Sequence, residues 1–313
     1  MSTFYQRGIH KAALRKSMQS KELKRLLDIV RLDKNFVVFL RDDYFNVYYR
    51  GGNVAKVESA KSVQFDKEYF REHKNKEEED YSFINKRIEE ATALFKAGRY
   101  QEYLNMIIAA MEHYFELGLK NGEEKESQHQ LCINNTFESA SEYILLDVEY
   151  MVSIKSKFAY CGKRRCGKDL DSIPKPRFDI IAIRKADGKI CIMELKKGTK
   201  ALTKKSGIGE HAESFENTVG YSKEREKFFV DEMRSVLSQM KDLNLIDNRI
   251  EILSDEVEYM FVFQENSKEL NTANQVQVFR DTMKKELQRE GLTKEYPVIE
   301  LRDKEYSLRN NRL

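Results

Sequence analysis

Long apolar runs are absent from this sequence, and no stretch approaches the ~20 residues that a helix needs to cross a bilayer. The opening residues MSTFYQRGIHKAALRK also lack the apolar core of a secretory signal, and they continue into an ordinary helical pattern. Four cysteines do not make a disulfide framework in a chain of 313 residues. Cys161 and Cys166 have no second pair at the spacing of a zinc ribbon. We therefore expect a soluble, cytoplasmic protein with reduced thiols.

Two common catalytic signatures are missing as well. The sequence contains no glycine-rich phosphate loop of the form G-x-x-x-x-G-K-[ST], which argues against an NTPase. It also contains no nucleophile elbow of a Ser-His-Asp hydrolase. The 55 basic and 52 acidic residues nearly balance, so the net charge does not identify a partner and only the local distribution of charge can.

Apolar periodicity, turn residues and a charge run organise the first part of the chain, residues 1–120. The run EHKNKEEED at 72–80 is expected to be a solvated loop. Gly51-Gly52 between aromatic and β-branched segments is typical of a hairpin, and Gly98 interrupts a helical pattern. We expect this part to bind nucleic acid or to mediate oligomerisation. The predicted elements are a helix over 8–32, strands over 36–42, 44–50 and 54–60, and two helices within 81–118.

In the rest of the chain, segments with strand patterns alternate with segments with helix patterns. This order predicts an α/β (α+β) fold with a mixed sheet flanked by helices. Residues 121–265 form the expected core, and residues 266–313 add a helix and a short strand that pack on it. Asp187-Gly188 is a strong hairpin turn, so the strands on either side of it should pair antiparallel. The predicted elements are a helix over 123–135, strands over 143–154, 177–184 and 189–196, a helix over 223–243, a strand over 257–265, a helix over 274–290 and a strand over 297–302.

Three side chains are expected to meet at one end of this hairpin. Asp179 lies near the start of the first strand, and Glu194 lies near the end of the second, at roughly the same level across the turn. Glu194 and Lys196 are two apart, so they point to one face, while Leu195 points to the other. An E-x-K triplet alone is a weak signal, because surface strands often carry both residue types. Its place beside an aspartate at the end of an apolar hairpin makes it a candidate site.

Phosphodiester hydrolysis needs this set of groups. Carboxylates can hold a divalent cation that neutralises developing negative charge and activates water, and two or three of them suffice for Mg²⁺. A lysine beside the cation can orient water or stabilise charge. We therefore expect Asp179 and Glu194, with the backbone carbonyl of Leu195, to bind Mg²⁺ or Mn²⁺, and Lys196 to complete the catalytic set.

The pattern of Asp179 followed by Glu194-Leu195-Lys196 resembles the motif of the PD-(D/E)xK nuclease superfamily. The order helix, three strands, helix, strand is similar to that superfamily's core and covers residues 121–265. The resemblance implies a restriction-endonuclease-like fold and an endonuclease, with a role in bacterial restriction or anti-phage defence. Phe178 stands where the motif has proline, although Pro176 lies two residues earlier. The metal chemistry does not need that proline.

The resemblance also implies an acidic residue on the helix before the first strand. Glu126 is the candidate, with Glu123 and Glu124 as rivals, and spacing alone does not choose among them. His211 could assist proton transfer or bind phosphate, or it could simply make a local hydrogen bond. The accessory candidates, each of which also has an ordinary structural explanation, are Gln128 on the same helix, Glu149 in the first strand, Gln239 in the later helix and His211 in the glycine-containing loop 206–215.

Basic residues flank the proposed site on both sides in the sequence. Basic rims beside a carboxylate site suit contact with a phosphate backbone, and neither cluster contains a base-reading motif. We expect a nucleic-acid partner, DNA rather than RNA, and a homodimer or a partner protein would suit an enzyme that cuts both strands. The clusters are Lys163, Arg164, Arg165, Lys168 and Arg177 around the start of the first hairpin strand, and Lys197, Lys200, Lys204 and Lys205 after the second.

These observations predict a Mg²⁺-dependent endonuclease that acts on DNA. One alternative is a nucleic-acid-binding or scaffold protein on the same fold, with weak or no catalysis. Another is an unrelated α+β interaction protein in which the triplet is a coincidence. That last alternative requires the carboxylates of Asp179 and Glu194 to lie too far apart to share one cation.

Overall fold

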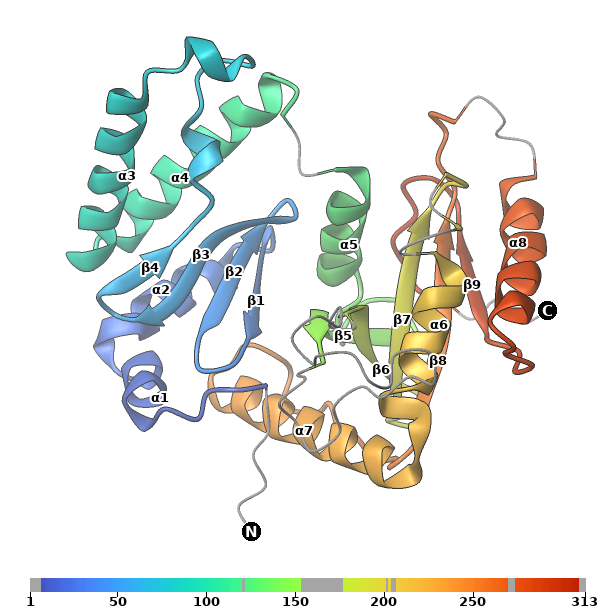
Figure 1. The fold of residues 1–313 in the computed structure, drawn as a ribbon. Coiled ribbons are helices and arrows are strands. Elements are labelled where there is room, and N and C mark those ends of the chain that lie inside the picture. Colours follow the sequence, from blue (N-terminus) through green and yellow to red (C-terminus); the bar gives the residue numbers. More distant parts are fainter. Residues whose placement is uncertain are drawn as a thin grey trace, which may run out of the picture. The chain divides into compact units, whose positions relative to one another are not determined.

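The computed structural model divides into two compact units (Figure 1). The first unit comprises Met1–His129 and Ser238–Ile246, and the second comprises Gln130–Leu237 and Asp247–Leu313. The division runs through two helices, α5 (Glu123–Asn134) and α7 (Lys223–Asp242). The structure describes residues 7–119, 122–152, 177–200, 202–203, 207–269 and 274–309.

The first unit contains a four-stranded antiparallel sheet in the order β1-β2-β3-β4. The strands predicted within residues 36–60 and the helix break at Gly98 are confirmed. The elements are α1 (Ala12–Gln19), α2 (Lys21–Leu32), β1 (Phe36–Leu40), β2 (Phe45–Tyr49), β3 (Gly52–Ser59), β4 (Ser62–Gln64), the short 3₁₀ helices η1 (Lys67–Phe70) and η2 (Lys76–Glu78), α3 (Tyr81–Lys96) and α4 (Tyr100–Glu116).

The single helix predicted over 8–32 was wrong, because Ser20 separates two helices. Its backbone is extended, and its hydroxyl accepts a hydrogen bond from the backbone N–H of Glu22. A serine in this position caps an otherwise unpaired N–H group, so it starts a new helix more readily than it continues an old one. Apolar spacing alone did not distinguish the two outcomes.

The second unit contains a five-stranded mixed sheet in the order β5-β6-β7-β8-β9. The first three strands form an antiparallel meander, and β8 and β9 then add in parallel. The predicted mixed α/β fold class is therefore confirmed. Beside α5 and α7, the elements are β5 (Tyr143–Met151), β6 (Arg177–Arg184), β7 (Ile190–Lys197), α6 (Ile208–Glu216), the 3₁₀ turn η4 (Val219–Tyr221), β8 (Val257–Gln264), α8 (Gln275–Arg289) and β9 (Val298–Leu301).

The helix α6 lies where a glycine-containing loop was predicted, so that prediction was wrong. Gly209 lies inside α6 and serves close packing rather than a turn. A Cβ atom at this position would come within 2.9 Å of Glu290 Cγ and 3.0 Å of the backbone oxygen of Glu286. Glu286 belongs to α8, so the missing side chain allows α6 to approach α8 closely.

Aromatic side chains attach two helices to one face of the mixed sheet. The Phe215 ring of α6 stacks on Tyr259 of β8, with ring centroids 4.6 Å apart. On the same side, the Phe279 ring of α8 stacks on Phe263, also at 4.6 Å. Strand residues alternate between faces, so Tyr259 and Phe263 share the face of their β7 neighbours Ile192 and Lys196. The candidate site therefore lies on the face that α6 and α8 cover.

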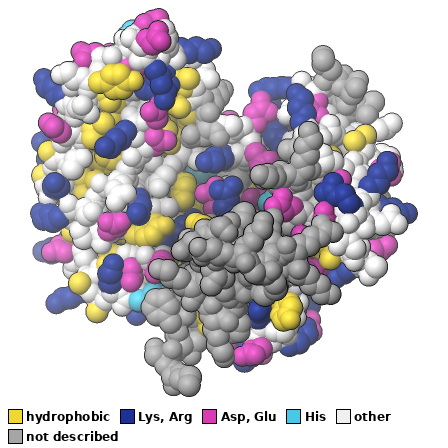
Figure 2. All heavy atoms as spheres, viewed as in Figure 1, with side chains coloured by type: hydrophobic (Ala, Val, Ile, Leu, Met, Phe, Trp, Pro, Cys, Tyr) yellow, Lys and Arg dark blue, Asp and Glu magenta, His cyan; other side chains and the backbone are white. Residues whose placement is uncertain are grey.

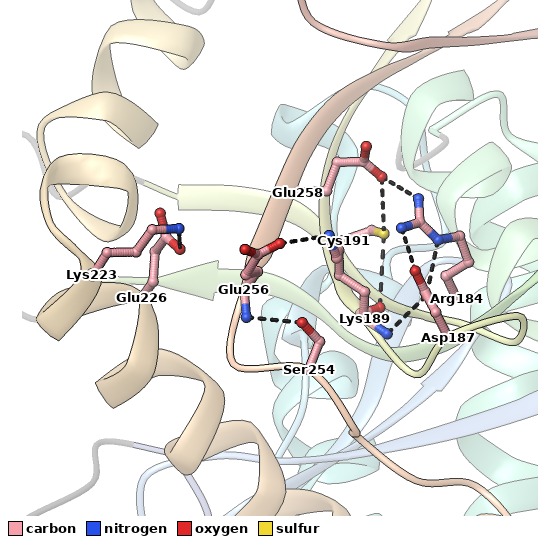
Figure 3. A network of polar contacts seen from close by, with 9 residues as sticks. All are labelled: Arg184, Asp187, Lys189, Cys191, Lys223, Glu226, Ser254, Glu256 and Glu258. Carbon is pink, nitrogen blue, oxygen red and sulfur yellow. Dashed lines mark hydrogen bonds and ion pairs between the residues drawn. The ribbon is translucent and has the colours of Figure 1, made fainter.

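A polar network closes the turn between β6 and β7 (Figure 3). The Arg184 guanidinium donates to Asp187 Oδ1 and Oδ2 at 3.0 and 2.7 Å, and it also binds Glu258. Asp187 Oδ1 accepts the backbone N–H of Lys189 at 3.1 Å. Gly188 has a left-handed φ of 65°, which a hairpin turn of this kind requires. The predicted antiparallel hairpin is confirmed, with Ile180 opposite Met193.

No helix within the described ranges is long and apolar enough to cross a membrane.

Truncating the stacked ring of α8 should strongly destabilise the fold. We expect Phe279→Ala to lower the free energy of unfolding by about 3–5 kcal/mol, because the fully buried side chain would leave a cavity against the sheet. Urea unfolding measures this change. Val278 on the same helix is 46% exposed, so Val278→Ala should change the stability by less than about 1 kcal/mol. Similar losses from both substitutions would show that the ring does not anchor α8.

Candidate active site

The register of β6 and β7 places Asp179 next to Glu194. Ile180 and Met193 form the last pair of the two strands. Asp179 and Glu194 lie immediately beyond this pair, at the end away from the turn. Asp179 Oδ2 accepts the backbone N–H of Leu195 at 3.0 Å. The Asp179 carboxylate therefore accepts a hydrogen bond from β7 at the point where the pairing of the two strands ends. This bond holds the Asp179 side chain against β7.

The two carboxyl groups are buried together. Asp179 is 8% exposed and Glu194 is fully buried, and the charge of Glu194 acts directly on Asp179. Burial and the neighbouring Glu194 raise the pKa of Asp179 to about 7, against the opposing charges of Lys196 and His211. Two carboxyl groups this close cannot both carry a negative charge without a shared proton or a cation. The alternative of an unrelated interaction protein required the carboxylates of Asp179 and Glu194 to lie far apart, whereas the structure places these residues side by side.

Lys196 completes the trio predicted from the sequence. It follows Glu194 by two residues on β7, so its side chain leaves the same face of the sheet. Only 4% of it is exposed. A buried ammonium next to two carboxyl groups offsets part of their negative charge, and it offers donors to any anion that enters the site.

His211 reaches the same site from α6. Its Nδ1 atom lies 3.0 Å from Glu194 Oε2. The sequence placed this histidine near the site in a loop, whereas the structure places it on a helix that packs against α8. His211 is therefore part of the candidate site by direct contact.

Glu149 and Arg177 lie at the edge of the site on β5 and β6. Val148 pairs with Ile180, so Glu149 is the β5 neighbour of Asp179. Its backbone adopts a left-handed φ of 49°, and its carboxylate lies 3.7 Å from an Arg177 guanidinium nitrogen. The accessory role of Glu149 stays a prediction. Its ion-pair partner Arg177 is one of the residues predicted to contact a phosphate backbone.

Three predicted site residues belong to the first unit, namely the acidic candidate Glu126 and the accessory candidates Gln128 and Gln239, and two of them have defined partners. Glu126 lies 3.6 Å from an Arg50 guanidinium nitrogen. Gln239 Oε1 accepts the backbone N–H of Ile9 at 2.7 Å, and Gln128 is half-buried on α5. The proposed functions of Glu126, Gln128 and Gln239 stay predictions.

The basic rims are only partly described by the structure. Lys197 lies 3.4 Å from Asp303, and Lys200 is exposed. Basic and acidic side chains are interspersed over the face in Figure 2. The candidates outside the described residues are Lys163, Arg164, Arg165, Lys168, Lys204 and Lys205, together with Cys161 and Cys166.

Two residues near the site were not found by sequence reasoning. Burial raises the pKa of Tyr259 far above its usual range, with further contributions from Glu194 and Asp179. The carboxylate of Glu269 accepts the backbone N–H and the hydroxyl of Thr199, so it holds the chain just after β7. Tyr259 and Glu269 lie far along the chain from Asp179 and Glu194, and neither residue type stood out in its own segment.

The acidic pair has suitable chemistry for a hard divalent cation. Within the described ranges, no group of three or more His, Cys, Asp or Glu side chains is arranged to hold a metal ion. A magnesium site needs fewer protein ligands, since Mg²⁺ keeps several waters. Asp179 and Glu194 supply two carboxylates whose mutual repulsion a cation would relieve, and Leu195 supplies a neighbouring carbonyl. These residues therefore fit a Mg²⁺ or Mn²⁺ ion.

Comparison of the chain with family models, with curated proteins and with solved structures gave no match. The interpretation of the site therefore depends on its geometry and on the resemblance of its motif.

The raised pKa of Asp179 predicts a stability that falls as the pH rises. The folded state holds this proton up to about pH 7, whereas the unfolded chain releases it near pH 3.8. The stabilising contribution is complete below that lower value and is lost between the two. We expect urea unfolding in chelator to show a loss of a few kcal/mol across this window, and Asp179→Asn to remove it.

Asp187→Asn is the contrasting variant. The Arg184 hydrogen bond lowers the pKa of Asp187, so its contribution is lost only at acidic pH. This variant should keep the loss of stability between pH 4 and 7. An unchanged pH profile in Asp179→Asn would refute the assignment.

Proposed function

We propose that this chain is a metal-dependent nuclease that hydrolyses phosphodiester bonds in DNA, with the second unit as its catalytic core. One observation carries the proposal. The buried carboxyl groups of Asp179 and Glu194 meet at the end of the β6–β7 hairpin, and Lys196 follows on the same face of the sheet.

The topology of the second unit supports this proposal. A helix precedes three antiparallel strands, and further helices lead to a fourth strand that pairs in parallel with the third. This is the element order of the PD-(D/E)xK core that the motif resembles. A short motif gains weight when it occupies the expected strands in the expected order, since chance rarely produces both.

Asp179 and Glu194, with the carbonyl of Leu195, would hold the cation. When bound, Mg²⁺ or Mn²⁺ would supply positive charge against the developing phosphorane and the leaving oxygen. The chain itself would contribute two further effects. Lys196 would donate to a phosphate oxygen, and the bond from Leu195 to Asp179 would keep that carboxylate from turning away.

The burial of these groups strengthens both effects. Charges attract more strongly in a low-dielectric surrounding than in water, so an ammonium that is 4% exposed stabilises a nearby anion better than a surface lysine does. The basic residues that flank the motif in sequence, Arg177 and Lys200 among the described ones, would bind the DNA backbone without reading its bases.

Cleavage of plasmid and single-stranded DNA tests the proposal directly. We expect wild-type protein to cut in Mg²⁺ or Mn²⁺ and not in chelator. Asp179→Asn and Lys196→Met should each lower the rate by at least ~100-fold, because each removes a group needed for charge stabilisation. Glu256→Gln is the matched control, since Glu256 is exposed and pairs with Lys189 just before β8 at the opposite end of the strands.

The outcome also separates the nuclease from a binding module. No cutting by the wild-type chain, with salt-sensitive DNA binding retained, would overturn the nuclease in favour of a nucleic-acid-binding or scaffold protein. Equal activity in all variants would place the catalysis elsewhere.

A further inference from the structure

Glu194 is held by side chains from two different elements. On β6, the neighbouring Asp179 interacts electrostatically with it. On α6, His211 Nδ1 lies 3.0 Å from Glu194 Oε2. The Glu194 side chain is fully buried and the His211 side chain is 18% exposed, so the contact is largely shielded from water and solvent competes weakly for it.

The position of His211 is set by the packing of α6. Phe215, one helical turn further on, stacks on Tyr259 of β8 with an interplanar angle of 16°. Gly209, two residues before His211, has no room for a side chain against α8. The helix is thus fastened to the sheet on one side and to α8 on the other. The imidazole is presented to Glu194 by a rigid element.

We infer that His211 is a positioning residue that holds the Glu194 carboxylate in the orientation required for cation binding. This inference rests on the proposed function, because it concerns the same acidic pair. A cation held by Asp179 and Glu194 would relieve the repulsion between the two carboxyl groups. The His211 contact is made to Glu194 Oε2 from a different element, α6.

The physical reason is the rotational freedom of the carboxylate. A partner 3.0 Å from Oε2 would restrict the rotation of the carboxylate before the cation arrives, so binding would require less ordering. Partners that hydrogen-bond to a metal ligand in this way typically contribute 10–100-fold in metal affinity. The contact atom is Nδ1, so a hydrogen bond to Glu194 would require a proton on that nitrogen.

Direct titration of the full chain with Mn²⁺ tests the inference, with binding followed by electron paramagnetic resonance at one fixed pH. We expect His211→Ala to weaken Mn²⁺ binding by about 10–100-fold. His211→Asn should restore most of the affinity, because its amide nitrogen takes the place of Nδ1. His211→Gln should not, because its amide nitrogen corresponds to Nε2.

The comparison of Asn with Gln separates positioning from support of the fold. Both side chains are polar and of similar size, so a purely structural role would affect both variants alike. Urea unfolding in chelator verifies that each variant is folded. Glu213→Gln is the matched control, because Glu213 lies on α6 two residues from His211 and so on another side of the helix.

The possible outcomes distinguish this inference from the proposed function. Unchanged Mn²⁺ affinity in both His211→Ala and His211→Gln would overturn the inference, whether or not the chain cuts DNA. Mn²⁺ binding that follows the expected order in a chain without cleavage would support the inference and refute the nuclease. A wild-type chain that binds no Mn²⁺ would overturn both.

Discussion

The antiparallel pairing of β6 with β7 is the constraint on which the candidate site depends. Side chains alternate along a strand, so a shift of one residue in this pairing would turn Glu194 and Lys196 away from Asp179. The turn network of Arg184 and Asp187 sets the pairing at one end of the strands. The bond from Leu195 to Asp179 continues it at the other end, where the site lies.

Burial determines the chemical properties of this site and also lowers the stability of the folded chain. Two carboxyl groups and an ammonium lie on one face of an apolar sheet, beneath α6 and α8, and the His211 imidazole of α6 reaches them from the helix side. Burying such groups is unfavourable unless each has a partner, and the raised pKa of Asp179 reflects the remaining imbalance. A divalent cation would correct that imbalance, so the feature that destabilises the folded chain at neutral pH is the one that favours metal binding.

Much of the second unit could be predicted because its signals are local. Apolar strands, a D-G turn and an amphipathic helix are each read within a short window, and they predicted β6, β7 and α7 closely. The helix α6 was missed because glycine usually marks a loop. Gly209 instead permits close contact with α8, which lies far along the chain. From the sequence alone, a glycine that allows close packing cannot be distinguished from a glycine that forms a turn, because the packing partner is not known.

The sequence by itself determined that Asp179, Glu194 and Lys196 would converge, because a tight turn and strand alternation relate residues that are close along the chain. Only the tertiary structure decided that His211 touches Glu194, that Tyr259 lies near the acidic pair, and how strongly burial shifts the pKa of Asp179. These features depend on the parallel pairing of β8 and on the packing of α6 against α8. Such contacts join distant segments, and the free energy that selects them comes from the whole core rather than from any local pattern.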